Sequence, residues 1–256
     1  MHVDFDHLSV EKEGKIARIT IDRTERLNAF HYDAVRDLDA VSQLLADDHD
    51  LRLVTIQGAG RAFSTGIDLK DLSADEIDMS YHRPWERALR RFETMEPLVL
   101  CLIHGYALGG GLQLALSCDI RVCTHSAEMG LPAINESIIP GLGTFRLPRY
   151  IGLGRAKKMV ILGNNVDGDE AERIGLVDHL VDEGTMHEEF EELIEQYMRV
   201  NSQGARLSKQ AMLTCFDQEF DAFLERYLEL QTEAMTGEDF VEATTAYRED
   251  REPEWK

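Results

Sequence analysis

Three consecutive glycines, Gly109 to Gly111, are the feature that most constrains how this 256-residue chain folds. They follow the apolar run 98–103 and open the apolar, helix-prone segment 112–116. Residues without a Cβ atom allow another group to approach the backbone closely. Amide N–H groups at the start of a helix have no partner within that helix and attract negative charge. The three glycines are therefore a candidate anion or oxyanion site.

A second glycine-rich segment, Gly58 to Lys70, follows the apolar run 51–56 and also places backbone amides after an expected strand. Taken singly, either segment is weak evidence, because glycines after strands are often only turns. The presence of two such segments in one chain favours a shared site.

Short apolar runs alternate with amphipathic helical segments in the first 200 residues, which is typical of buried parallel strands in an α/β core. Residues 34, 38, 41 and 45 share one helical face. After residue 183 only helical patterns remain, with helices expected at 184–200, 204–216 and 217–236. We predict an α/β core at 1–200 and a helical region at 201–256. The expected strands are at 16–21, 51–56, 98–103, 120–123 and 176–181.

Composition excludes several classes of protein. The formal net charge of −21 argues against nucleic-acid binding, which needs a basic surface. No apolar stretch reaches the length of a membrane span, and the acidic N-terminus lacks a signal pattern, so we expect a cytoplasmic protein without membrane contact. The four cysteines form no Cys-x-x-Cys pair, and we expect no metal site. No dinucleotide fingerprint, phosphate loop or serine nucleophile elbow is present.

Four segments in this order resemble the crotonase superfamily, the enoyl-CoA hydratase/isomerase family. They are Leu27-Asn-Ala-Phe, the segment 58–69, Gly-Tyr-Ala-Leu-Gly-Gly-Gly at 105–111, and Ile139-Pro-Gly-Leu-Gly-Thr. The resemblance implies an α/β, crotonase-like spiral of ββα and βββα turns with a helical C-terminal region that forms a homotrimer or a dimer of trimers. It also implies a small-molecule acyl-CoA substrate, with coenzyme A as part of that substrate and no separate cofactor.

The same resemblance implies which residues form the site. Two backbone amides, those of Ile67 and Gly110, would hold the thioester oxygen. Preorganised donors of this kind stabilise a developing enolate oxyanion by about 3 to 4 kcal/mol each. The residues matched to substrate and coenzyme A binding are Leu27, Ala29, Ser64, Gly66, Asp68, Leu69, Lys70, Leu108 and Gly109.

The chain departs from the family at its acid positions. Gln113 and Ala133 stand where the familiar hydratases carry two glutamates, and Gly141 occupies a third acid position. Neither an amide nor a methyl group takes up a proton at neutral pH, so these positions cannot support the two-carboxylate mechanism. Glu136 is the nearest carboxylate, and in a helix it would lie about one turn from Ala133. Glu136 is therefore our candidate for the catalytic carboxylate.

Other polar residues have simpler structural interpretations. Asp68 and Asp119 adjoin turns or strand starts, where aspartate commonly bonds nearby amides. His104 ends an apolar run, which favours a hydrogen-bonded packing role. The variable segment between the glycine motifs carries a candidate acyl pocket, and its residues are His82, Trp85 and Arg87.

The leading hypothesis is an acyl-CoA enzyme that stabilises a thioester enolate and transfers a proton through one carboxylate. A single base suits isomerisation of an enoyl group better than hydration. Two alternatives stay open: a catalytically impaired acyl-CoA-binding protein of the same fold, and a carbonyl-substrate enzyme that does not use coenzyme A. The sequence does not specify the acyl group or the native reaction.

Overall fold

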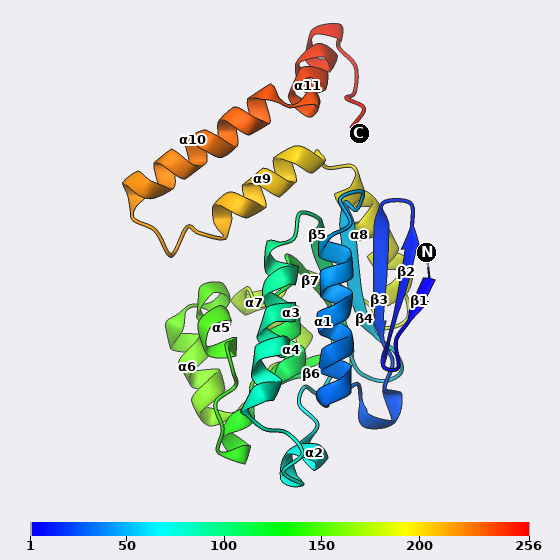
Figure 1. Cartoon of the computed structure of the whole chain (residues 1–256), viewed down its shortest axis with the longest axis vertical. Coiled ribbons are helices and arrows are strands. Elements are labelled where there is room, and N and C mark those ends of the chain that lie inside the picture. Colours follow the sequence, from blue (N-terminus) through cyan, green and yellow to red (C-terminus); the bar gives the residue numbers. More distant parts are fainter. Residues whose placement is uncertain (1, 256) are drawn as a thin grey trace.

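The fold, seen in a computed structural model that describes residues 2–255, is built on one seven-stranded sheet with the strand order β1-β2-β3-β4-β5-β7-β9 (Figure 1). The first three strands pair antiparallel, and the following strands pair parallel. The strands are β1 (His2–Asp4), β2 (Leu8–Glu13), β3 (Ile16–Ile21), β4 (Leu53–Gly58), β5 (Leu98–Ile103), β7 (Ile120–Thr124) and β9 (His179–Val181).

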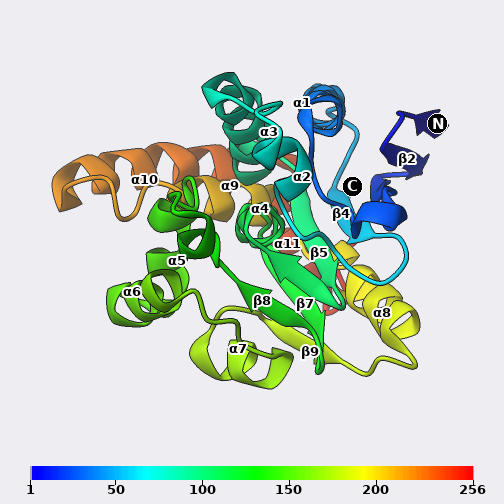
Figure 2. The ribbon, with the colours of Figure 1, turned by 90° about the horizontal axis from the view of Figure 1, so that it is seen from below.

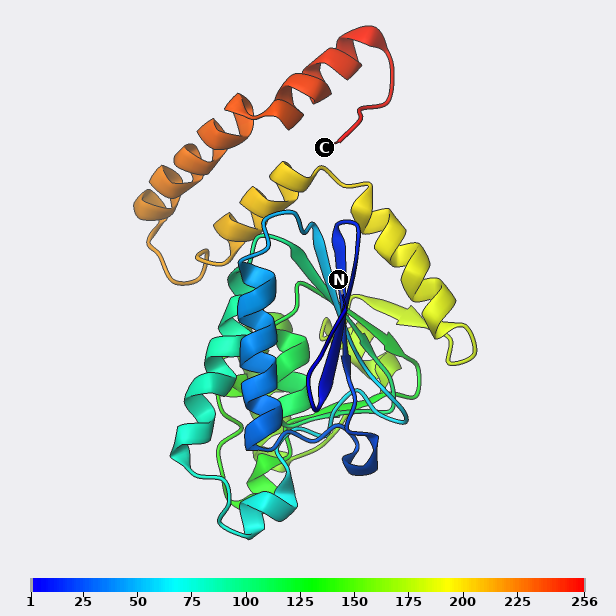
Figure 3. The same ribbon diagram turned by 45° about the vertical axis from the view of Figure 1, so that its right-hand side comes forward.

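Helices cover both faces of this sheet, which explains why its parallel strands are almost continuously apolar. On one face lie α1 (Tyr32–Ala46), α3 (His82–Thr94) and α4 (Gly110–Leu116), whose apolar side chains join the main core. On the other face, α8 (Met186–Met198) packs Phe190 and Ile194 against the second set of strand side chains. Figure 3 shows α1 and α8 on opposite sides of the strands.

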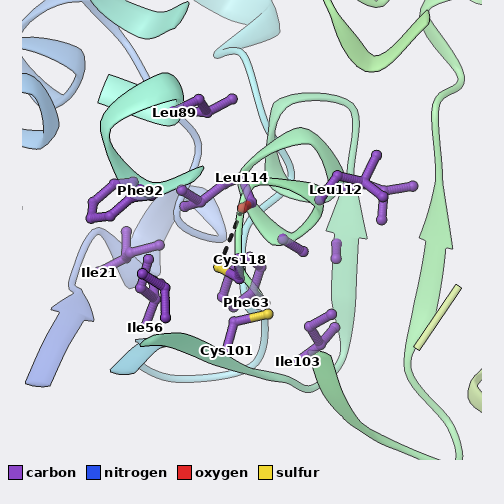
Figure 4. Close-up of a cluster of buried hydrophobic side chains, with 14 of the residues drawn as sticks. Ile21, Ile56, Phe63, Leu89, Phe92, Cys101, Ile103, Leu112, Leu114 and Cys118 are labelled. Atoms are coloured by element: carbon purple, nitrogen blue, oxygen red, sulfur yellow. Dashed lines mark hydrogen bonds between the residues drawn. The ribbon is translucent and has the colours of Figure 1, made fainter. Parts of the chain in front are cut away.

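The core between α3, α4 and the sheet is tightly filled (Figure 4). Leu89 and Phe92 come from α3 and Leu114 from α4, and all three side chains are fully buried. Cys118 is also buried and donates its thiol to the carbonyl oxygen of Leu114 at 3.4 Å. This packing fixes α3 and α4 relative to β5, which becomes important for the site because both helices border it.

A smaller parallel sheet pairs β6 (Tyr106–Leu108) with β8 (Glu128–Gly130), and isolated bridges extend it from Ser64 to Ala107 and from Met129 to Val166. Figure 2 shows β8 beside the main sheet, with α5 (Gly143–Ile151), α6 (Leu153–Leu162) and α7 (Gly168–Ile174) around it. The chain therefore winds through repeated strand and helix turns, and the expected α/β fold with a helical C-terminal region is confirmed.

Asp167 caps α7, because its carboxylate accepts from the amide of Glu170 at 2.9 Å. The strand expected at 176–181 begins only at His179, because the carbonyl of Leu176 accepts from the Arg121 guanidinium at 2.9 Å instead of joining the sheet.

The C-terminal helices are α9 (Ser202–Met212), α10 (Phe220–Thr236) and α11 (Glu238–Glu249). The helix expected at 204–216 ends four residues early, and α11 was not expected. Figure 1 shows α10 and α11 extending away from the sheet above α9. Large apolar side chains lie open here, with Phe216 71% and Phe220 74% exposed. None of the helices in the described part of the chain is both long and apolar enough to span a membrane.

A buried ion pair attaches α9 to the core. The ammonium group of Lys209, which is 5% exposed, donates to Asp119 at 2.7 Å and to the carbonyl oxygen of Pro97 at 3.0 Å. Asp119 also accepts from the amide of Val99 at 2.8 Å, so its role is structural. Burial raises the pKa of Asp119, although Lys209 opposes that rise.

We predict that Lys209→Met lowers the free energy of unfolding by about 3 kcal/mol at neutral pH, because it leaves the buried Asp119 carboxylate without its cation. The loss grows as pH rises through the raised pKa of Asp119, because the folded variant must then hold an uncompensated charge. It shrinks in acid, where the carboxyl is neutral. Urea unfolding at two pH values measures the loss of unfolding free energy. The double variant Lys209→Met with Asp119→Asn serves as the control. A loss that is independent of pH and equal in both variants would contradict the charge argument.

Candidate active site

The site begins where two backbone segments touch. Gly66 has a φ of +84°, and a Cβ atom there would lie 2.4 Å from the amide nitrogen of Gly110 and 2.6 Å from the carbonyl oxygen of Leu108. A Cβ at Gly111 would lie 2.1 Å from the carbonyl oxygen of Ser64. All three distances are far below any van der Waals contact, so only glycine fits at either position.

Hydrogen bonds hold the two segments in this register. Ser64 donates its amide to the carbonyl oxygen of Tyr106 at 2.9 Å, and Leu108 donates back to that of Ser64 at 3.0 Å. These bonds extend the small sheet into the loop after β4. They also hold this loop next to the start of α4. The two glycine-rich segments of the sequence therefore lie against each other.

Ile67 and Gly110 both line one cavity. Across residues 2–255, neither N–H group donates a hydrogen bond within the protein. Two neighbouring unpaired donors on a cavity can stabilise an oxyanion, provided that the oxyanion lies about 3 Å from both. The convergence of the two amides and their catalytic role stay predictions.

The cavity is small, about 60 Å³, and its wall is mostly apolar. The three positions that depart from the family's acid pattern, Gln113, Ala133 and Gly141, all line it. No aspartate or glutamate is among its lining residues in the described chain. The complete lining is Ile67, Tyr81, His82, Trp85, Gly109, Gly110, Gln113, Ala133, Ile138, Ile139, Pro140 and Gly141.

Glu136 lies at the rim. It ends the 3₁₀ helix Ala133–Glu136, and its side chain is exposed. Ala133, at the other end of this helix, lines the cavity, whereas Glu136 does not. The structure thus brings Glu136 near the site without bringing its side chain into the cavity wall.

The residues matched to coenzyme A binding divide into two groups. Leu27, Ala29 and Ser64 lie together, since the Ser64 hydroxyl donates to the carbonyl oxygen of Asn28 at 2.7 Å and Thr65 donates its amide to that of Leu27 at 3.1 Å. Gly66, Leu108 and Gly109 also belong to this first group, because they lie where the loop after β4 meets the segment before α4. In the second group, Leu69 and Lys70 are exposed on the short helix α2 (Leu69–Ser73).

Asp68 is occupied by local bonds. Its carboxylate accepts from Arg23 at 2.6 Å and from the amide of Lys70 at 3.0 Å, which caps α2. Burial alone would raise the pKa of Asp68, but these donors lower it below its usual value. Such a carboxylate is a weak base, which agrees with a structural role.

The variable segment carries His82, Trp85 and Arg87, and only part of it reaches the cavity. His82 and Trp85 line it, whereas Arg87 turns to Asp39 of α1 and pairs with its carboxylate. His104 lies elsewhere: its Nε2 bonds the carbonyl oxygen of Gly60 at 3.1 Å, and burial lowers its pKa.

Sequence reasoning missed two parts of the site. Tyr81 and Ile138 form part of the wall, and no motif marks their role, whereas Ile139, Pro140 and Gly141 come from the motif that begins at Ile139. Glu86 lies beside Gly141, 3.4 Å from where a Cβ atom of that residue would be, and accepts from the amide of Leu142 at 3.2 Å and from the buried Arg146 at 2.7 Å. The one signal for Glu86 was its position next to Trp85 on the amphipathic helix α3.

No three His, Cys, Asp or Glu side chains of residues 2–255 cluster closely enough to hold a metal ion.

Comparisons with known proteins agree with this geometry. The family described as Enoyl-CoA hydratase/isomerase matches residues 11–256. The chain is 33% identical over 258 residues to a short-chain-enoyl-CoA hydratase of Clostridium acetobutylicum, with 98% of each chain covered. It is 30% identical over 256 residues to a crotonyl-CoA hydratase of Syntrophomonas wolfei, with 96% of each covered. Its structure resembles an enoyl-CoA hydratase of Bacillus anthracis with a TM-score of 0.91 at 28% identity, covering 98% of this chain and 99% of the other.

We predict that Gly110→Pro lowers kcat for any thioester reaction by about 10²- to 10³-fold, because proline removes the amide donor. Proline is otherwise compatible with the first position of a helix, where Gly110 lies. Gly110→Ala is the matched control, since it adds a Cβ at the same place, 3.1 Å from the Cα of Gly66, and keeps the N–H. Steady-state kinetics of the two variants test this, and equal losses in both would contradict the role of the amide.

Proposed function

This chain belongs to the enoyl-CoA hydratase/isomerase family, and we propose that within this family of acyl-CoA enzymes it isomerises an enoyl-CoA through a thioester enolate. The observation that carries the proposal is the cavity that bears two unpaired backbone amides and no carboxylate on its wall. Oxyanion donors without a pair of carboxylates suit removal and return of one proton better than addition of water.

The reaction has a simple proton balance. A base removes a proton from the carbon next to the double bond, and negative charge moves to the thioester oxygen. The amides of Ile67 and Gly110 would stabilise that charge as it develops. The same group then returns the proton to the far carbon of the original double bond, so that the double bond moves next to the thioester carbonyl. Coenzyme A enters as part of the substrate, and we propose no further cofactor.

Two side chains are candidates for the base. Glu136 is our first candidate, since it is the carboxylate one 3₁₀ turn from Ala133, which lines the cavity. His82 is the second, because its ring lies on the cavity wall, edge-on to Tyr81 with the ring centroids 5.6 Å apart. An imidazole can also act as a base at neutral pH.

We predict that Glu136→Gln lowers isomerisation of 3-enoyl-CoA by at least about 10²-fold and leaves acyl-CoA affinity nearly unchanged, because the variant keeps its shape and loses its base. His82→Gln is the parallel variant, and Glu76→Gln on an exposed loop is the control. Conversion to the 2-enoyl thioester, followed by its absorbance, gives the rate.

Three outcomes are informative. An active Glu136→Gln variant with an inactive His82→Gln variant would transfer the role to His82. Full activity in both would exclude a single base at either position. Brisk hydration of crotonyl-CoA by the wild type would contradict the isomerase assignment, because Gln113 and Ala133 lack the acid and base that hydration needs.

We propose in addition that the chain forms a homotrimer or a dimer of trimers through its C-terminal region. The open apolar side chains of α9, α10 and the turn between them support this, since exposed clusters of this kind usually mark an interface. Met212 is 65%, Phe216 71% and Phe220 74% exposed in the single chain.

We expect sedimentation at micromolar concentration to give a trimer or hexamer. Phe216→Ser with Phe220→Ser shifts the protein toward the monomer, because it removes apolar area that association would bury. Met79→Ser is the control, since Met79 is 78% exposed and lies far along the chain from α10. A monodisperse wild-type monomer would contradict the assembly.

A further inference from the structure

We infer that Ser64 and Asn28 are positioning residues of the proposed oxyanion site: they hold the loop of Ile67 so that its amide keeps one direction, and they do so without touching the substrate. The inference rests on the proposed function, because it concerns one of the two amides assigned there. Neither side chain is among the residues that line the described cavity. Both act through the backbone of the loop after β4.

The direction of the Ile67 amide is set by the peptide bond that it shares with Gly66. In a trans peptide the N–H and the preceding C=O point in opposite directions. The carbonyl oxygen of Gly66 accepts from the amide of Phe30 at 2.6 Å, and the carbonyl oxygen of Phe30 accepts from the amide of Asp68 at 2.9 Å. Phe30 therefore holds the residues on both sides of Ile67. The free N–H of Ile67 points away from Phe30.

Ser64 holds the other peptide bond of Gly66. Its hydroxyl accepts from the Gly66 amide at 3.1 Å and donates to the carbonyl oxygen of Asn28 at 2.7 Å. Gly66 has no Cβ atom to restrict its backbone, so the bond to Ser64 supplies a restraint that the residue itself lacks. Ser64 is fully buried, and both of its hydroxyl bonds are to backbone atoms. The hydroxyl therefore serves the loop and not a ligand.

The carbonyl of Asn28 reaches Ser64 from an unusual turn. Two consecutive residues are left-handed, with a φ of +51° at Leu27 and +57° at Asn28, which is uncommon for residues other than glycine. The carbonyl oxygen of Leu27 accepts from the amide of Thr65 at 3.1 Å, beside the bond from Ser64 to Asn28. Strained backbone persists only where the surrounding structure imposes it, and it concentrates at functional sites. Here the turn presents two successive carbonyls to the loop.

The Asn28 side chain maintains this turn. It is fully buried, and its Oδ1 accepts from the amide of Arg23 at 2.9 Å. Its Nδ2 donates to the carbonyl oxygens of Ala59 at 2.9 Å and Ala62 at 2.7 Å, which both belong to the loop after β4. Asparagine tolerates the left-handed conformation better than most residues, and its carboxamide supplies the two donors and the acceptor that these bonds need.

The second amide of the site needs no such support. Gly110 shares its peptide bond with the carbonyl of Gly109, which accepts from the amide of Gln113 at 3.1 Å as the first bond of α4. Helix geometry thus orients the N–H of Gly110. The amide of Ile67 lies outside any helix, so its direction depends on the bonds of Ser64 and Asn28. Loss of either side chain is therefore expected to affect one donor of the pair and spare the other.

Infrared difference spectra of bound butyryl-CoA, labelled with ¹³C at its carbonyl carbon, test this inference. Hydrogen bonds to the thioester oxygen lower its stretching frequency, and we expect the wild type to lower it relative to the free thioester. Ser64→Ala removes about half of that shift, because one of two donors loses its orientation. The same variant lowers kcat for isomerisation of 3-hexenoyl-CoA by about 10- to 10²-fold and changes KM less than about twofold, since orientation matters most in the transition state.

Ser42→Ala is the matched control. Ser42 is also fully buried, donates to the carbonyl oxygen of Asp39 at 2.8 Å and accepts from Arg91 at 3.2 Å, but it lies on α1. Its loss lowers stability and leaves the frequency shift and kcat as in the wild type. Asn28→Gly keeps a left-handed backbone and removes the side-chain bonds, so it also reduces the shift and gives an independent reading if Ser64→Ala unfolds. Thermal melting confirms that each variant is folded.

The outcomes separate this inference from the proposed function. A folded Ser64→Ala variant with the full shift or an unchanged kcat overturns the inference and leaves the proposed function standing. An equal loss in Ser42→Ala does the same, because the effect would then be general destabilisation. If butyryl-CoA does not bind to the wild type, or binds with the frequency of the free thioester, no amide holds its oxygen and the proposed function fails as well.

Discussion

The contact between Gly66 and Gly110 is the constraint on which the rest of the site depends. A Cβ atom at Gly66 would lie 2.4 Å from the amide nitrogen of Gly110, so the loop after β4 meets the start of α4 only because residue 66 has no side chain. That contact brings two unpaired amides to one cavity. Their positions are fixed by sheet bonds and buried packing, and not by the identity of any polar side chain. Main-chain donors therefore persist while the surrounding side chains change, which allows one scaffold to carry different reactions.

The sequence was sufficient for the parts of the site that backbone chemistry controls. Glycine runs after apolar strands indicated where segments must approach closely, and the alternation of strands and helices indicated the α/β core. The part of the wall formed by Tyr81 and Ile138 was beyond reach, because these residues meet the glycine-rich segments only through tertiary packing. Spacing placed Glu136 one turn from Ala133, but spacing along a short helix does not say whether a side chain is covered, and Glu136 is exposed. Leu176 was likewise expected in a strand, but its carbonyl oxygen accepts a hydrogen bond from the Arg121 guanidinium and does not join the sheet.

The replaced acid positions form one connected region. Gly141 leaves room for the Gln113 carboxamide, because a Cβ atom at residue 141 would lie 2.7 Å from its Oε1. Gly141 also has a φ of +47°, a conformation that a side chain would strain. Beside Gly141, Glu86 accepts from the amide of Leu142 and from the buried Arg146, which in turn pairs with Glu93. The carboxylates of this region thus hold the wall together, and none of them is among the residues that line the described cavity.

The two ends of the parallel strands have separate roles. At the amino end of β5, Lys209 and Asp119 bond the carbonyl oxygen of Pro97 and the amide of Val99, and so attach α9 to the core. At the carboxyl ends of β4 and β5, the chain leaves the sheet for the loops that carry Ile67 and Gly110. Ligands of open α/β sheets bind at such carboxyl ends, where loops diverge and leave a crevice. Because α9 is attached at the opposite end, the C-terminal helices can expose apolar surface for association without covering the cavity of their own chain. One buried lysine therefore attaches the C-terminal helices at the end of the sheet opposite the loops that carry Ile67 and Gly110.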